Sequence, residues 1–149
     1  MKKNISALLP IILILSLAAG CIRETPTSEI ESDINVDVDL SRFSATIVHT
    51  ELNRILSNPG DYLGKTIRMR GPYYYFDYQD AGKRHHYVAV EIADACCMNG
   101  LEFIWDGEDA FPDGYPPETA RIDVIGVFSR YEEAGDTYYY LATDGVVLA

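Results

Sequence analysis

The sequence of 149 residues has few cysteines, few basic residues and no long apolar run. Its three cysteines, Cys21, Cys96 and Cys97, form one adjacent pair and one separate residue, which is not a disulfide framework. The longest apolar run, residues 7–17, is too short for a bilayer-spanning helix. Because 12 Lys and Arg stand against 23 Asp and Glu, the net charge is −11, which disfavours nucleic-acid binding.

The sequence also lacks the short motifs of several enzyme classes. It has no Gly-x-Ser-x-Gly nucleophile turn, phosphate-binding loop, dinucleotide fingerprint or His-Glu-x-x-His helix. Carboxylates are abundant, but their spacing marks no pair as acid and base. We therefore expect a non-catalytic protein without a cofactor.

The N-terminus has the pattern of a bacterial lipoprotein signal peptide. Two lysines follow Met1, an apolar run comes next, and the small residues 18–20 lead into Cys21. This order resembles the lipobox, in which the cysteine sulfur receives a lipid before the signal is cleaved. We expect residues 1–20 to be a removed signal peptide and Cys21 to carry the lipid. The protein would then be anchored in the cell membrane and face the extracytoplasmic side.

Residues 21–43 are expected to form a tether between this anchor and the domain. The segment begins as a polar, acidic stretch typical of a flexible linker. Towards its end, apolar and polar residues alternate with the period of a half-buried strand, so docking along a sheet edge is an alternative for residues 34–40. Residues 44–149 then form one domain, long enough to bury a core.

One helix and five strands are predicted within this domain. Apolar residues recur at spacings of three and four in residues 44–58, Ser44 or Thr46 can cap the start, and Pro59 and Gly60 end the helix. Turn signals separate the strands, among them Asn99-Gly100 and Ala134-Gly135-Asp136. The strands are predicted at residues 66–75, 86–93, 101–105, 121–129 and 137–142.

Two of these strands share a pattern with a central glycine. Ile67-x-Met69-x-Gly71-x-Tyr73 has the same form as Ile122-x-Val124-x-Gly126-x-Phe128. Glycine within a strand permits the sharp bends that small barrels need at their corners. The pattern predicts a mainly β protein with a five-stranded OB-like barrel and one N-terminal helix. The alternative is an open meander packed against the helix.

The chain resembles uncharacterised bacterial lipoproteins whose mature domain is OB-like. Besides the lipobox, the resemblance rests on four segments and covers roughly residues 44–142: residues 58–66, 96–103, 125–128 and 131–133. It implies the barrel and no particular activity. A fainter likeness to a permease-associated family linked with metal supply includes the Cys-Cys pair. That family continues with alanines and aspartate, whereas Met98-Asn99-Gly100 follows here, so no metal role is carried over.

Tyrosines and cations point to a binding face. All eleven tyrosines lie after residue 61, and five Lys and Arg fall within residues 65–86 of an acidic protein. An exposed tyrosine offers apolar area and a hydrogen bond, which suits a small molecule, a glycan or a protein. The alternatives are ordinary strand tyrosines and a solvated hairpin tip. The predicted contact residues are Arg68, Arg70, Tyr74, Tyr75, His85 and Tyr87.

Three interpretations are open for Cys96 and Cys97. They are small apolar groups at a strand end, a strained disulfide between neighbours, or ligands of a soft metal. Glu102 is the best third donor if a turn at residues 98–100 brings it across a hairpin. A thiol-based redox or soft-metal-binding lipoprotein is therefore the alternative function.

Overall fold

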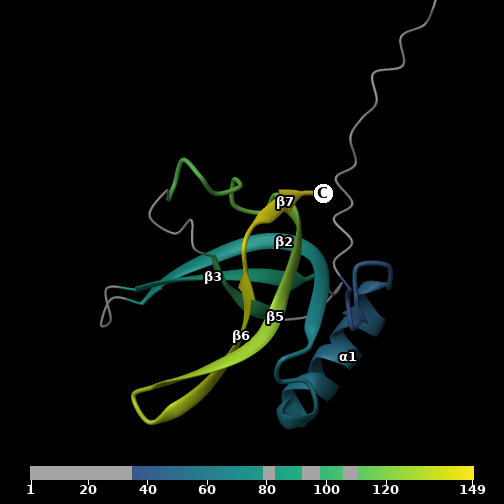
Figure 1. Ribbon diagram of the computed structural model, residues 1–149. Coiled ribbons are helices and arrows are strands. Elements are labelled where there is room, and N and C mark those ends of the chain that lie inside the picture. Colours follow the sequence, from purple (N-terminus) through teal and green to yellow (C-terminus); the bar gives the residue numbers. More distant parts are fainter. Residues whose placement is uncertain (1–34, 79–82, 92–97, 106–110) are drawn as a thin grey trace, which may run out of the picture. The chain divides into compact units, whose positions relative to one another are not determined.

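A closed ring of five strands organises the fold, which is mainly β (Figure 1). The computed structural model describes residues 35–78, 83–91, 98–105 and 111–149. Hydrogen-bonded pairing runs from β2 (Thr66–Tyr78) to β3 (Lys83–Val90), β4 (Asn99–Trp105), β6 (Asp136–Thr143) and β5 (Arg121–Glu133). Because β5 pairs back with β2, the strands do not form an open meander.

Within the ring, only β4 and β6 run parallel, and the other pairs are antiparallel. β2 is long enough to pair with two different strands. Its first half, residues 66–72, pairs with β5, and its second half, residues 73–78, pairs with β3. β2 therefore changes partner near its centre, and this change lets the sheet curl back on itself.

Helix α1 (Ala45–Ser57) confirms the predicted helix to within one residue at each end. Val48, Leu52 and Ile55 face the core, as their spacing of three and four requires. A short 3₁₀ helix, η1 (Pro59–Asp61), follows and leads into β2. No helix in the part of the chain that the structure describes is long and apolar enough to cross a membrane.

Two short strands extend the ring. β1 (Val38–Asp39) runs parallel to β2, and the next residue, Leu40, is buried in the core. The folded unit thus includes the end of the segment expected to be a tether. β7 (Val146–Leu148), which the sequence did not predict, pairs with β5.

The predicted strands are all present, but their bounds differ from the prediction. β2 continues to Tyr78 and β5 to Glu133, beyond the apolar alternation that marked them. The predicted turn at Asn99-Gly100 is wrong, because both residues belong to β4 and pair with Val90 and Ala89. The predicted turn before β6 is confirmed. Ala134 and Gly135 both have positive φ, at 53° and 94°, as a two-residue hairpin turn requires.

The two glycine-containing strands lie side by side. Ile67 pairs with Gly126 and Gly71 pairs with Ile122, so each glycine stands opposite an isoleucine. A Cβ at either glycine would come closer than 3.0 Å to a backbone carbonyl oxygen of a third strand. Glycine is required at both positions because the backbones approach so closely.

The core fills the ring. Its fully buried members come from all five ring strands, and α1 adds Leu52 and Ile55. Besides these two, the largest are Tyr73, Phe103, Phe128, Leu40, Ile67, Met69, Leu101, Ile122 and Leu141.

Candidate functional site: a hollow on the outer face of β2, β3 and β4

An open hollow lies on the outer face of the ring. Its volume is about 210 Å³, and it is lined by Phe76, Tyr87, Ala89, Met98, Asn99 and Gly100. Ala89 and Gly100, which are paired across β3 and β4, contribute little more than backbone to its lining, and a Cβ at Gly100 would lie only 2.6 Å from the carbonyl oxygen of Val88. Phe76 and Met98 remain 42% and 47% exposed, so the hollow offers apolar surface to a ligand.

A buried polar network borders this hollow. Glu102, the register partner of Tyr87, accepts a hydrogen bond from Tyr131 at 2.9 Å, and its other carboxylate oxygen lies 2.7 Å from Nδ1 of His85. His85 and Glu102 are only 6% and 5% exposed. Burial, together with the hydrogen bond to Glu102, raises the pKa of Tyr131 well above its ordinary value.

Tyr131 connects the β5–β6 hairpin to the face formed by β3 and β4. Its ring stacks on Tyr138 with centroids 5.4 Å apart, and Nζ of Lys83 lies 4.4 Å from its centroid. A hydrogen bond and a cation–π contact thus link three strands on the same side of the sheet. These contacts fix β3, β4 and β5 relative to one another next to the hollow.

The predicted tyrosines lie on both faces of the sheet. Tyr74 and Tyr87 are paired directly across β2 and β3. Tyr75 has the opposite orientation, because it contacts Phe111 edge-on at 5.1 Å and packs against the core. Two of the three predicted tyrosines therefore share the face that carries the hollow.

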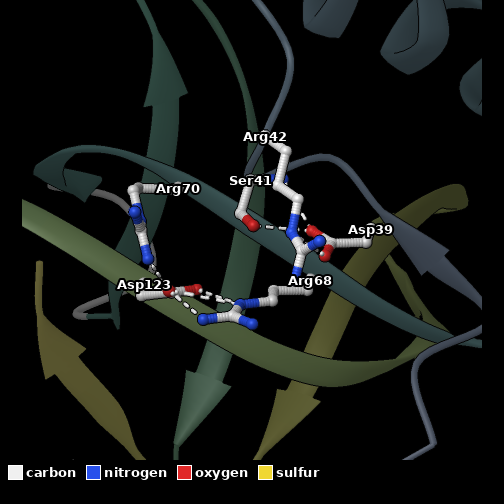
Figure 2. Close-up of polar contacts among 6 residues, drawn as sticks. All are labelled: Asp39, Ser41, Arg42, Arg68, Arg70 and Asp123. Carbon is white, nitrogen blue, oxygen red and sulfur yellow. Dashed lines mark hydrogen bonds and ion pairs between the residues drawn. The ribbon is translucent and has the colours of Figure 1, made fainter.

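Arg68 and Arg70 lie in a different cluster, which Figure 2 shows. Both hold the buried carboxylate of Asp123, Arg68 through two nitrogens and Arg70 through Nη2 at 2.6 Å. Burial raises the pKa of Asp123, but the hydrogen bonds and charges of the two arginines outweigh it and lower the pKa overall. The structure does not bring these arginines together with the predicted tyrosines.

Histidine 86 faces inward, in contrast to His85. Its ring is 3% exposed, stacks on Tyr115 with centroids 4.2 Å apart and lies 2.7 Å from the hydroxyl of Tyr73. Burial lowers the pKa of His86 to about 4, so the ring is neutral near pH 7.

Cys21, Cys96 and Cys97 lie outside the described residues. Glu102, the expected third donor, belongs to β4, and both its carboxylate oxygens have partners in the network. The turn at residues 98–100 that was to bring Glu102 towards the cysteines is absent, since β4 already includes Asn99. Within the described ranges, no group of three His, Cys, Asp or Glu could hold a metal ion.

Of the six residues that line the hollow, only Tyr87 was among the predicted contact residues, and the other five were missed: Phe76, Ala89, Met98, Asn99 and Gly100. Phe76 follows Tyr74 at the strand period of two, so alternation along β2 could have placed it on the same face. Met98 and Asn99 gave no such signal because they were assigned to a turn. Comparison of the chain with protein-family models and with curated proteins gives no match.

Proposed function

We propose that this chain is a lipid-anchored, extracytoplasmic, non-catalytic binding module that uses the hollow on β2, β3 and β4. The observation that carries the proposal is the exposed apolar lining of that hollow, from Phe76 and Met98, beside the amide of Asn99. Sites for small ligands combine such apolar walls with a few polar groups.

The order of strands supports an OB-like barrel. If the ring strands β2, β3, β4, β5 and β6 are numbered one to five in chain order, their order around the ring is one, two, three, five, four and back to one. Strands three and five, which are β4 and β6, run parallel. This is the order of an OB barrel, whose second and third strands commonly form the ligand-binding face. Here those strands are β3 and β4, which carry most of the hollow.

The size of the hollow limits what it can hold. Drug-sized ligands occupy roughly 300–1,000 Å³, which exceeds the volume available here. An aromatic ring, a single sugar or one side chain of a protein partner matches the hollow better. Such a group would lie between Phe76 and Met98. The NH2 group of Asn99 already bonds to His49 and Asn53, so only Oδ1 of Asn99, which also accepts the Gly100 N–H, can accept a hydrogen bond from a ligand.

A fragment titration tests the binding face. The purified full chain, labelled with ¹⁵N, is titrated with neutral aromatic fragments, monosaccharides and tripeptides, and amide shifts are recorded. We expect shifts concentrated in residues 87–90 and 98–101 for at least one class. Phe76→Ala should abolish them, whereas Phe43→Ala, which removes a phenylalanine that is 51% exposed elsewhere, should not. Shifts that persist unchanged in Phe76→Ala would exclude this hollow.

The anchor is tested separately. The full chain is expressed in a bacterium that is fed an alkyne analogue of palmitate, and label and membrane association are measured. We expect the label in the membrane fraction and its loss in Cys21→Ser, while Cys96→Ser keeps it. Unlabelled protein that retains residue 1 in the soluble fraction would refute anchoring.

A further inference from the structure

The amide of Asn99, which lines the hollow on β2, β3 and β4, is arranged to accept hydrogen bonds. Its NH2 group lies 3.0 Å from Nδ1 of His49 and donates to Oδ1 of Asn53 at 3.3 Å. Its Oδ1 accepts the Gly100 N–H at 2.9 Å, and this contact fixes the orientation, because a reversed amide would set its NH2 group against that N–H. A carbonyl oxygen has two lone pairs, so a ligand that bonds to Oδ1 must be a donor.

Two aromatic rings form adjoining walls of the same hollow. The ring centroids of Phe76 and Tyr87 are 5.6 Å apart, and the ring planes meet at 69°. The face of an aromatic ring is its negative side, which attracts a cation. Phe76 is 42% exposed, so its ring is within reach of a ligand. Met98, which is 47% exposed, adds a polarisable thioether.

The charges around the hollow favour a cation over an anion. None of the described residues that line it is Lys, Arg, Asp or Glu. The arginine and the lysine of β3 are held elsewhere, because Arg84 binds Asp77 through two nitrogens, at 2.7 and 3.0 Å, and Nζ of Lys83 lies 4.4 Å from the ring centroid of Tyr131. The net charge of −11 then attracts cations to this surface and repels anions from it.

We propose that the hollow binds an alkylammonium group, which is the charged end of a lysine side chain or of a free primary amine. The ligand occupies the hollow of the proposed function, on which its assignment rests. Its N–H groups donate to Oδ1 of Asn99, its charge lies against the rings of Phe76 and Tyr87, and its alkyl chain contacts Met98.

The size of the hollow allows these contacts to be made together. The rings and the Asn99 amide line one space of about 210 Å³, so a group inside it lies within a few ångströms of each wall. Attraction between a cation and a ring extends to about 6 Å from the ring centroid. A butylammonium ion is no larger than the single aromatic ring that matches the hollow, and it is protonated at neutral pH.

Three probes with the same four-carbon chain test the charge preference. The ¹⁵N-labelled full chain is titrated at pH 7 with butylammonium, butanol and butyrate. We expect butylammonium to shift the amides of residues 87–90 and 98–101 and to bind about two- to fivefold more tightly than butanol, as one cation–π contact requires. Butyrate should cause no localised shift.

Two outcomes of this titration would overturn the assignment. One is equal binding of butanol and butylammonium, which would leave the hollow as a binding site without a preference for charge, so the proposed function would stand. The other is the absence of localised shifts with butylammonium. In that case the separate titration with neutral fragments and sugars shows whether the hollow binds anything.

Phe76→Leu separates the charge of the ring face from its apolar area. The variant keeps an apolar wall without an aromatic face, so it should weaken butylammonium binding about two- to fivefold and leave butanol binding unchanged. Phe43→Leu, at a phenylalanine that is 51% exposed outside the hollow, should change neither. Equal weakening of both probes by Phe76→Leu, or equal weakening of butylammonium binding by the two variants, would overturn the proposal.

A blocked tripeptide with a central lysine distinguishes the two sources of the ammonium group. Tighter binding of this peptide than of butylammonium would identify a lysine of a protein partner, and weaker binding would identify a free amine. Acetylation of the lysine removes its charge and should abolish the preference over butanol. An acetylated peptide that binds as tightly as the unmodified one would contradict the role of the charge.

Discussion

Arg68 of β2 binds Asp123 of β5 through two nitrogens, with Nε 3.1 Å from Oδ1 and Nη2 2.7 Å from Oδ2. The aspartate side chain is 9% exposed, and Arg70 adds a second cation to it. The pair lies across the β2–β5 contact, at the place where the ring of strands closes. The two arginines compensate the negative charge of the buried carboxylate. Because removing that charge leaves both guanidinium groups without their ionised partner, it should lower the stability of the fold strongly.

Asp123→Asn is expected to destabilise the fold by about 2–3 kcal/mol, because two guanidinium groups lose their ionised partner. Urea unfolding followed by circular dichroism measures the change. Glu51→Gln is the matched control, since it breaks the more exposed pair with Arg54 on α1 and should cost about 0.5 kcal/mol. Equal costs for the two variants would show that burial of Asp123 adds nothing.

Gly71→Ala is expected to destabilise the fold by at least about 3 kcal/mol, because the added methyl group would collide with the carbonyl oxygen of Ala89. Gly60→Ala provides the control, since nothing lies within 4 Å of a Cβ there. That change should be neutral or slightly stabilising. Thermal unfolding of the two variants distinguishes a close backbone approach from a general intolerance of alanine.

Tyr131→Phe is expected to cost about 1.5–3 kcal/mol, because Glu102 loses a donor in a buried place while the ring stacking remains. Tyr138→Phe removes the hydroxyl of the exposed ring stacked on it and should change stability by less than about 0.5 kcal/mol. Urea unfolding of both variants gives the comparison. Similar values for both would mean that the network on β3, β4 and β5 contributes little.

His86 is expected to make stability depend on pH. The unfolded histidine binds a proton below about pH 6.5, whereas the folded one stays neutral until about pH 4. The unfolded state therefore binds more protons in this window, and the free energy of unfolding falls by roughly 3 kcal/mol as the pH drops across it. Unfolding measured between pH 7 and 4 shows the slope.

The double variant Tyr73→Phe/His86→Phe should lose most of this slope, because it removes the histidine together with its hydroxyl partner. Tyr73→Phe alone keeps the histidine and should keep the slope. The depressed pKa of Asp123 acts at lower pH, where protonation removes the stabilisation that its carboxylate gives at neutral pH. An unchanged slope in the double variant would show that His86 titrates normally.

Local sequence patterns were enough to predict α1 and the positions of the ring strands. Alternation identified buried Ile67 and Met69, because it depends on near neighbours in the chain. Spacings of three and four marked five helix residues, of which three are buried and Ile47 and Leu56 are exposed: Ile47, Val48, Leu52, Ile55 and Leu56. The far ends of β2 and β5 escaped prediction. Residues 130–133 are polar and form a strand only because they pair with residues 136–139 of β6.

The contacts of the candidate sites needed tertiary structure. Arg68 and Asp123 are separated by 55 positions, so nothing local indicated that they meet. His85 follows Lys83 and Arg84 and was assigned to a cationic tip, yet Glu102 and Tyr131 from two other strands bury it. The hollow depends on the pairing of Ala89 with Gly100, a register that alternation alone does not specify.

The attachment of β1 also has a mechanical consequence. Asp37 both donates its backbone N–H to Thr66 and accepts the Thr66 N–H on its carboxylate, and the Leu40 N–H bonds to Arg68. Among the contacts of the described residues, the bonds between Asp37 and Thr66 are the first that tension from the N-terminal side would load. Detachment of β1 would free its two residues and leave the five-stranded ring closed. A pull on this segment would therefore remove β1 without opening the ring.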